Sequence, residues 1–302
     1  MALAMDVTLQ DIIMGDANNN VLFASAANSK ISGNGGDDFI YGNIGDDQLF
    51  GGSGNDTLDG GAGDDLIRGG TGDDMLDGNV GDDVLYGDTG NDLIFGSDGN
   101  DEVSGGDGND YVNGGNGDDL LNGGKGNDLL TGASGDDVVF GNSGDDQLSG
   151  NQGADTLEGG TGNDMLDGGD SDDHLNGGSG DDVISGGNDS DHIRGGAGVD
   201  ILTGGDGFDT FEFTLVDVLP GGVYQGMDTI TDFGAGNQLD LSDFTNGVTD
   251  NIDDFVHVNW NEGELNSVLS VKIGDAFVDI ALLVGVQGGS ASAWASDGMI
   301  LA

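Results

Sequence analysis

The sequence contains GGSGNDTLD at residues 51–59, followed directly by GGAGDDLIR at residues 60–68. This nine-residue pattern recurs without a gap from residue 33 to residue 212, which is 180 residues or twenty nonads. Position one is Gly and position six is Asp in all twenty, and position eight is always apolar. Position four is Gly except at Ser171 and Asp189. A fixed period of this kind is typical of a solenoid built from one repeated structural unit.

The spacing predicts a six-residue turn and a three-residue strand in each nonad. Gly suits the turn because it adopts positive φ and lets backbones approach closely, and the position-eight side chain points inward from the strand. Two nonads would make one coil, and coils of 18 residues would stack at about 4.8 Å. We therefore expect an all-β fold, a right-handed parallel β-roll of ten coils with a small C-terminal β segment.

The charge balance indicates that a cation holds this fold together. The chain of 302 residues has 58 Asp and Glu against 5 Lys and Arg, a formal net charge of −53, and no Cys. Nucleic-acid binding is excluded by this charge, and disulfides and thiolate metal sites are excluded by the absence of Cys. One aliphatic side chain per nonad contributes too little to offset the entropy of ordering nine residues. Cation binding must supply the difference.

Position six falls at the same place in nonads two apart, so each edge of the roll would carry a ladder of ten carboxylates. Between stacked turns, two carboxylates with backbone carbonyls would supply the six or more oxygens that calcium prefers. Nine gaps per edge give up to about eighteen ions, which would bring the net charge to about −17. Position five is Asp or Asn in sixteen nonads and would add outer carboxylates or turn hydrogen bonds. The predicted metal ligands are Asp38, Asp47, Asp56, Asp65, Asp74, Asp83, Asp92, Asp101, Asp110, Asp119, Asp128, Asp137, Asp146, Asp155, Asp164, Asp173, Asp182, Asp191, Asp200 and Asp209.

These nonads resemble the GGxGxDxUx repeat of the RTX (repeats-in-toxin) proteins, where U is a large aliphatic residue. The resemblance covers about 60% of the chain. It implies a parallel β-roll, calcium bound by the position-six Asp with turn carbonyls, and export by a type I secretion system. The chain departs from the pattern at Ala154, Ser171, Asp189, Val199 and Phe208, where Gly or Asx is usual.

The flanks are predicted to continue as β structure. Residues 6–32 keep the nine-residue phase in degraded form, with Asp11, Asn20 and Ser29 at position six. Three strands there would cap the roll or leave an open β-edge for another molecule. Beyond residue 212, six segments have strand-like patterns: residues 211–215, 227–233, 238–241, 255–260, 268–273 and 277–284. The predicted domains are therefore residues 1–32, 33–212 and 213–302.

The C-terminal segment resembles a secretion signal. Residues 228–233 (DTITDF), 239–244 (LDLSDF) and 297–302 (DGMILA) are similar to the secretion target region behind RTX arrays, and the segment would also cap the roll. Residues 1–13 do not have the pattern of a Sec signal peptide, and no apolar stretch approaches the twenty residues of a membrane span.

Motifs of known enzymes are missing from the sequence. The histidines, His174, His192 and His257, lack the HExxH spacing of zinc proteases, and there is no G-x-S-x-G elbow. We expect no enzyme activity. His174 and His192 are 18 residues apart at position seven and should be neighbours on one face, either as a metal-binding or pH-sensitive pair or as two surface residues.

Position seven is expected to face outward, and one of its two columns is apolar at eight of ten places. Such patches mark association surfaces, although β-propensity alone also favours these residues. The other column is apolar at four of ten places. The apolar column is Phe39, Thr57, Met75, Leu93, Tyr111, Leu129, Gln147, Met165, Val183 and Ile201.

These features together favour a secreted, non-enzymatic calcium-binding protein that folds on calcium outside the cell. It would serve as a surface-layer, matrix or self-assembling filament component. Its expected partners are calcium, the type I secretion apparatus, and either further copies of itself or a cell-surface polysaccharide. The alternative is a small membrane-active or host-interacting effector.

Overall fold

The computed structural model describes residues 12–25, 27–214, 217, 226–233, 236–241, 243, 256–261, 266–273, 276–284 and 300–301. They fall in two compact units, Met1–Val139 and Phe140–Ala302, and each is described by itself. The elements of both units are β-strands. The all-β parallel solenoid predicted from the repeats is confirmed.

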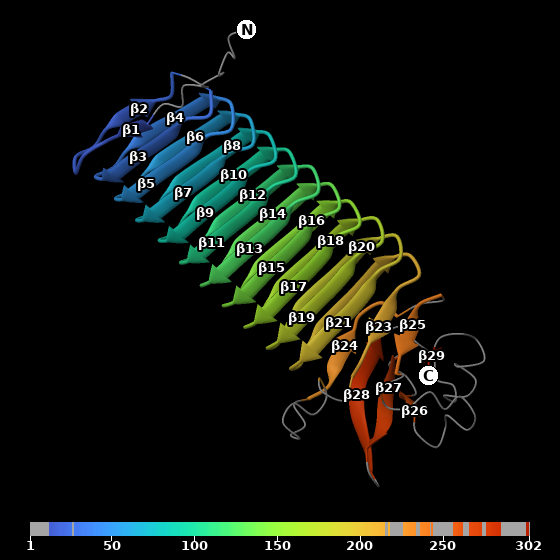
Figure 1. Cartoon of the computed structure of the whole chain (residues 1–302). Helices are drawn as coiled ribbons and strands as arrows, with labels where there is room; N and C mark the ends of the chain where they lie inside the picture. The colour runs from blue at the N-terminus through green and yellow to red at the C-terminus, as the bar shows by residue number, and fades with distance from the viewer. Residues whose placement is uncertain are drawn as a thin grey trace. The chain divides into compact units, whose positions relative to one another are not determined.

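The first unit contains two parallel sheets whose strands lie side by side in Figure 1. Their orders are β1-β3-β5-β7-β9-β11-β13 and β2-β4-β6-β8-β10-β12-β14. Paired residues are 18 apart, for example Leu93 and Tyr111, so two nonads form one coil as predicted. The strands are β1 (Ile12–Met14), β2 (Val21–Phe23), β3 (Lys30–Gly35), β4 (Phe39–Ile44), β5 (Gln48–Ser53), β6 (Thr57–Ala62), β7 (Leu66–Thr71), β8 (Met75–Val80), β9 (Val84–Thr89), β10 (Leu93–Asp98), β11 (Glu102–Asp107), β12 (Tyr111–Asn116), β13 (Leu120–Lys125) and β14 (Leu129–Ser134).

The second unit continues the same pattern and then departs from it. Its sheets have the orders β17-β19-β21-β23-β25-β29 and β16-β18-β20-β22-β24-β28-β27-β26, and β26, β27 and β28 pair antiparallel. β15 (Val138–Ser143) spans the division between the units. The remaining strands are β16 (Gln147–Gln152), β17 (Thr156–Thr161), β18 (Met165–Asp170), β19 (His174–Ser179), β20 (Val183–Asn188), β21 (His192–Ala197), β22 (Ile201–Asp206), β23 (Thr210–Glu212), β24 (Asp228–Ile230), β25 (Gln238–Asp240), β26 (Val256–Asn261), β27 (Asn266–Ile273), β28 (Ala276–Val284) and β29 (Ile300–Leu301).

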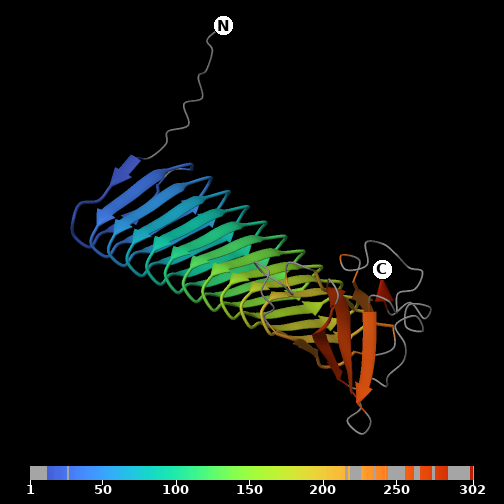
Figure 2. The ribbon, with the colours of Figure 1, turned by 90° about the horizontal axis from the view of Figure 1, so that it is seen from below.

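The strands are longer than the sequence pattern predicts. Each nonad of the array was expected to give three strand residues, but β4 to β22 contain six, from position seven to position three of the next nonad. Positions two and three also pair with the neighbouring coil, as Ser97 does with Gly115 and Asp98 with Asn116, while the Gly at position one is skipped. Because these backbone groups also need hydrogen-bond partners, the turn shortens to positions four to six. Figure 2 shows these turns in a row between successive strands of the first unit.

The core of each unit is a single file of apolar side chains per sheet. Every position-eight residue from Ile40 to Phe211 is at most 2% exposed, which confirms that this position faces inward. Position two has positive φ even where it is not Gly, as at Asn79 and Asp88, and Asn and Asp tolerate this conformation better than other residues. Position four keeps it at Ser171 and Asp189, the two departures from Gly.

Both flanks form strands where the sequence predicts them. At the N-terminal end, β1, β2 and β3 match the three expected strands, although Asp11 lies outside the described residues. At the C-terminal end, β23 to β28 overlap the six predicted segments, and β29 is an additional short strand. The domain boundaries at residues 32 and 212 stay predictions.

Candidate calcium-binding turns

The position-six aspartates line the inside of the turns. All twenty are buried, with exposed fractions of 3% or less. Each comes two residues before the buried apolar side chain at position eight, so both side chains point to the same side of the backbone. Aspartates 18 residues apart therefore follow one another along each row of turns, as the sequence predicts.

One oxygen of these carboxylates is bound to the backbone of the neighbouring coil. Asp56 Oδ1 accepts the N–H of Asp38 at 2.8 Å, and Asp74 Oδ1 accepts the N–H of Asp56 at 2.7 Å. The same bond recurs within both units. Each bond links position six of one coil to position six of the next, so the aspartates help to set the coil spacing.

The other carboxylate oxygen, Oδ2, is buried without a hydrogen-bond partner. A buried acceptor of this kind is costly unless something satisfies it. The atom recurs at the same place in every coil, which points to a repeated ligand and not to a local defect. The aspartates concerned include Asp38, Asp47, Asp56, Asp65, Asp74, Asp83, Asp92, Asp101, Asp110, Asp119, Asp164, Asp173, Asp182, Asp191, Asp200 and Asp209.

Oδ2 converges with a backbone carbonyl over the Gly at position one. A Cβ added to Gly60 would collide with Asp65 Oδ2 and would lie 2.9 Å from the carbonyl oxygen of Gly78, one coil further on. The same arrangement recurs at Gly78, whose Cβ would collide with Asp83 Oδ2. The turn thus keeps position one free of a side chain and places two kinds of oxygen around it.

Burial without a counterion raises the pKa of these carboxyl groups. The main cause is desolvation, and neighbouring carboxylates add to it, while the backbone N–H bond to Oδ1 acts in the opposite direction. The pKa is raised to about 7 for Asp65, Asp74, Asp83, Asp119, Asp173, Asp182 and Asp191. It is raised to about 6 for Asp56, Asp92, Asp101, Asp164 and Asp200.

The chain cannot neutralise these carboxylates with its own cations. It has 5 Lys and Arg, and three of these pair with other acids: Arg68 with Asp88, Lys125 with Asp107, and Arg194 with Asp217. An external cation that accepts hard oxygen ligands meets the need.

The donor set fits calcium better than a metal that requires several side-chain ligands. Among the described residues, no group of three or more His, Asp or Glu side chains is placed to hold a metal ion. Backbone carbonyls must therefore supply many of the oxygens around each ion, and calcium accepts such mixed sets of six to eight ligands. The role of each individual aspartate as a ligand stays a prediction.

Position five forms a second ladder on the outside of the turns. Asp37 Oδ1 accepts the N–H of Asn55 at 3.0 Å, and Asn55 Oδ1 accepts the N–H of Asp73 at 3.1 Å. This confirms turn hydrogen bonds as one of the two expected roles of these residues. Val199 and Phe208 still donate their N–H groups to the preceding coil, but they have no side-chain oxygen with which to continue the ladder.

Two residues beyond the repeats extend the position-six ladders, and the sequence analysis missed them. Asp228 Oδ1 accepts the N–H of Asp200 at 2.9 Å, and Asn237 Oδ1 accepts the N–H of Asp209 at 3.2 Å. Burial, together with the nearby Asp200, raises the pKa of Asp228 to about 8. The available signal was local: Asp228 and Asn237 each stand two residues before an apolar residue that is fully buried, Ile230 or Leu239.

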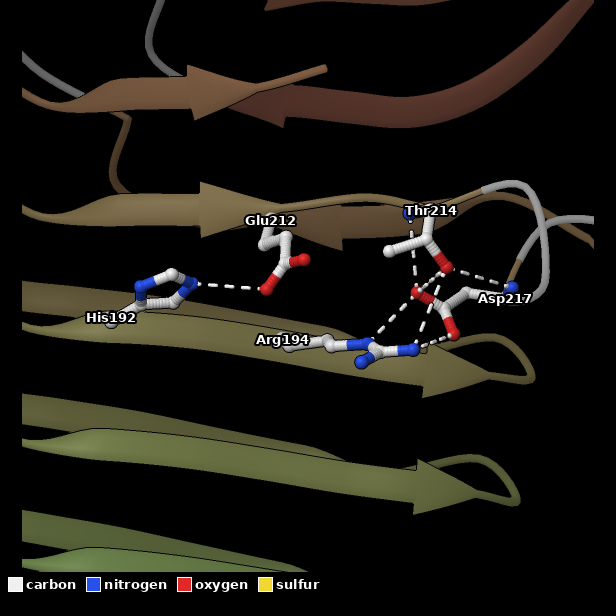
Figure 3. A network of polar contacts seen from close by, with 5 residues as sticks. All are labelled: His192, Arg194, Glu212, Thr214 and Asp217. Atoms are coloured by element: carbon white, nitrogen blue, oxygen red, sulfur yellow. Dashed lines mark hydrogen bonds and ion pairs between the residues drawn. The ribbon is translucent and has the colours of Figure 1, made fainter. Parts of the chain in front are cut away.

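The two predicted histidine neighbours do lie together. His174 and His192 are paired in register, and their ring centroids are 5.5 Å apart. Figure 3 shows His192 Nε2 beside Glu212 Oε2 at 3.1 Å. Burial and the adjacent His174 lower the pKa of His192. In the same view, the Arg194 guanidinium binds both oxygens of Asp217, whose Oδ2 also accepts the hydroxyl of Thr214.

A parallel β-solenoid whose turns repeat a buried Asp beside a Gly carbonyl is a calcium-binding repeat fold. The family model described as "RTX calcium-binding nonapeptide repeat (4 copies)" matches the chain in eight windows that together span residues 14–211, about two thirds of its length. The chain belongs to this family and binds multiple calcium ions. The windows are residues 14–49, 41–76, 50–85, 77–112, 86–121, 113–148, 149–184 and 176–211.

Three solved structures are similar to the chain at low TM-scores. The AlgE6R3 subunit of the mannuronan C5-epimerase of Azotobacter vinelandii is 23% identical, covering 62% of this chain and 80% of its own, with a TM-score of 0.24. The AlgE6R2 subunit of the same enzyme is 25% identical, covering 59% and 89%, with a TM-score of 0.28. A hyperactive, Ca²⁺-dependent, β-helical antifreeze protein from an Antarctic bacterium is 19% identical, covering 93% and 96%, with a TM-score of 0.31. At TM-scores this low, none of them bears on the function of this chain. A search of curated proteins found no match.

Replacing Asp119 by Asn tests the ligand assignment, with Asp118→Asn as the matched control. Asp119 is at position six with a buried Oδ2, whereas Asp118 is an exposed position-five residue whose Oδ1 accepts the N–H of Asp136, and Asn is common at position five. Asp119→Asn should lower the melting temperature in calcium by about 5 °C or more, because a lost charged ligand costs about 2 kcal/mol or more. Calorimetry should show little change for Asp118→Asn. Equal melting temperatures for the two variants would contradict the assignment.

Acid should partly replace calcium in stabilising the fold. The folded-state pKa values of about 6 to 7 lie above the ordinary Asp value of 3.8. The stability gained from the protonated carboxyls is therefore fully present below about pH 4 and is lost as the pH rises through 6 to 7. In a chelator, circular dichroism should show more β structure at pH 5 than at pH 8. A spectrum that stays constant down to pH 4.5, above the titration of ordinary Asp, is the opposing result.

Proposed function

We propose that the protein is a secreted, non-enzymatic structural component of a surface layer, matrix or filament, and that it folds on calcium outside the cell. The buried Oδ2 atoms carry this proposal, because they make the folded state depend on a cation. An activity that depends only on shape and association needs no site beyond the repeats themselves.

Calcium dependence would confine folding to the exterior. Extracellular calcium-binding modules have dissociation constants of about 10⁻⁴ to 10⁻³ M, so weak sites of this kind stay empty at the far lower calcium levels of the cytosol. A chain that binds metal only when folded also folds only when metal is present. The protein would therefore cross the secretion apparatus unfolded and become ordered after release.

Export is assigned to a type I secretion apparatus on the resemblance of residues 228–233, 239–244 and 297–302 to its target regions. β24 (Asp228–Ile230) and β25 (Gln238–Asp240) overlap two of these segments and extend the two sheets of the second unit. The segment is thus compatible with both roles expected of it, capping and export. Among the described residues, no helix is long and apolar enough to cross a membrane.

The position-seven column supports self-association. In the first unit, Phe39, Thr57, Met75, Leu93, Tyr111 and Leu129 are paired in register on successive strands. Val21 extends this column onto β2 and is 60% exposed. In the second unit, Met165, Val183 and Ile201 form the corresponding column and are also exposed. A row of exposed apolar side chains on a flat sheet is typical of an association surface.

Electron microscopy with and without calcium tests the proposal. Wild-type protein should form ordered fibres or sheets only in calcium. Met75→Glu should reduce this assembly because it places a charge in the apolar column. Leu120→Glu is the control, since Leu120 lies at position seven of the other sheet and has nearly the same exposure, 42% against 41% for Met75.

Dispersed monomers of the wild type in calcium would contradict the structural role, as would equal assembly of the two variants. Release of dye from vesicles by monomeric, calcium-loaded protein would instead favour the membrane-active alternative.

A further inference from the structure

The outer face of the first unit has a hollow that the calcium sites do not use. It lies over β5, β7 and β9, which are consecutive strands of one sheet (Figure 1), and has a volume of about 380 Å³. Its lining includes Phe50, Arg68, Gly70, Thr71, Asp88 and Thr89. These residues occupy positions nine, two and three of their nonads, which are not the positions that carry the buried carboxylates.

The repeat pattern explains why a hollow forms here. Phe50 and Arg68 are paired in register at position nine, and Gly52, Gly70 and Asp88 are paired in register at position two. Two of the three position-two residues are Gly, so the floor is bare backbone between the large side chains at position nine and the threonines at position three. Backbone and aromatic carbon atoms therefore form much of the surface.

A polar pair lies at one end of this apolar surface. Arg68 Nη2 donates to Asp88 Oδ1 at 2.7 Å, and Arg68 Nε donates to Asp88 Oδ2. The Arg68 side chain is 57% exposed and that of Asp88 is 23% exposed. Guanidinium has five N–H donors and a carboxylate has about four acceptor sites, so both groups keep free hydrogen-bonding capacity beside the hollow.

The charges of the lining favour a neutral ligand. Arg68 and Asp88 balance each other, and an anion would have to displace Asp88 or approach a chain of net charge −53. A cation would meet Arg68. A ligand that combines an apolar face with several neutral hydroxyl groups matches both the aromatic surface and the donor and acceptor pair.

We propose that this hollow binds a neutral hexose unit of a polysaccharide. The C–H face of the sugar would pack on Phe50 and the glycine backbone, while adjacent hydroxyls would bond to Arg68 and Asp88. This site is independent of the proposed assembly, because it lies on the sheet opposite to the apolar column. It would let a calcium-folded protein attach to glycans whether or not it polymerises.

A glycan array tests the site with the full chain in millimolar calcium. The array carries neutral hexose oligosaccharides and uronate oligosaccharides, and hits are quantified by titration calorimetry. Wild type should bind at least one neutral glycan. Phe50→Ala should weaken this binding about tenfold or more, since it removes the stacking surface. Asp88→Asn should also weaken it, and Asn is already found at other position-two places with positive φ, such as Asn79.

Phe140→Ala is the matched control, because Phe140 is also a position-nine Phe but stands apart from the Arg68 and Asp88 pair. It should bind as wild type does. Circular dichroism in calcium checks that every variant is folded. The site assignment is overturned if no neutral glycan binds, if folded Phe50→Ala binds as tightly as wild type, or if only uronate glycans bind.

Discussion

Burial of carboxylate oxygens at every turn is the constraint on which this structure depends. In each nonad, one Asp oxygen is satisfied by a backbone N–H of the neighbouring coil, and the other is buried against a glycine and a carbonyl. A charged oxygen in such a place is unfavourable unless a cation is present. The thin apolar core cannot compensate for a row of such groups, so stability and calcium binding are the same property in this chain.

The other regularities of the repeat follow from this arrangement. Position one must be Gly because any Cβ there would collide with the Asp oxygen five residues later, as at Gly60 with Asp65. Positions two and four take the positive φ values that bend the backbone around the site. Position five adds hydrogen bonds between coils but no buried charge, and for this reason Asn replaces Asp there freely. Only the residues facing outward remain free to vary, and any specific association must come from them.

The sequence predicts most of the fold because its period is unbroken. The 18-residue register, the buried position eight and the buried Asp rows all follow from spacing alone, and the structure confirms each of them. The strand length was wrong because the pattern cannot reveal that positions two and three also pair with the next coil. Asp228 and Asn237 were missed because they lie beyond the last regular nonad, where phase no longer identifies position six. The hollow at Phe50 depends on which side chains meet across coils, and this appears only once the register is known.

Calcium titration followed by calorimetry and circular dichroism tests the central claim most directly. In a chelator at neutral pH the chain should lack the β spectrum. Millimolar Ca²⁺ should restore that spectrum, with measurable heat and uptake of many ions per chain, up to about eighteen if every gap between turns is filled. Identical spectra in chelator and in calcium, with no heat of binding, would contradict the account, because the buried carboxylates would then be tolerated without any cation.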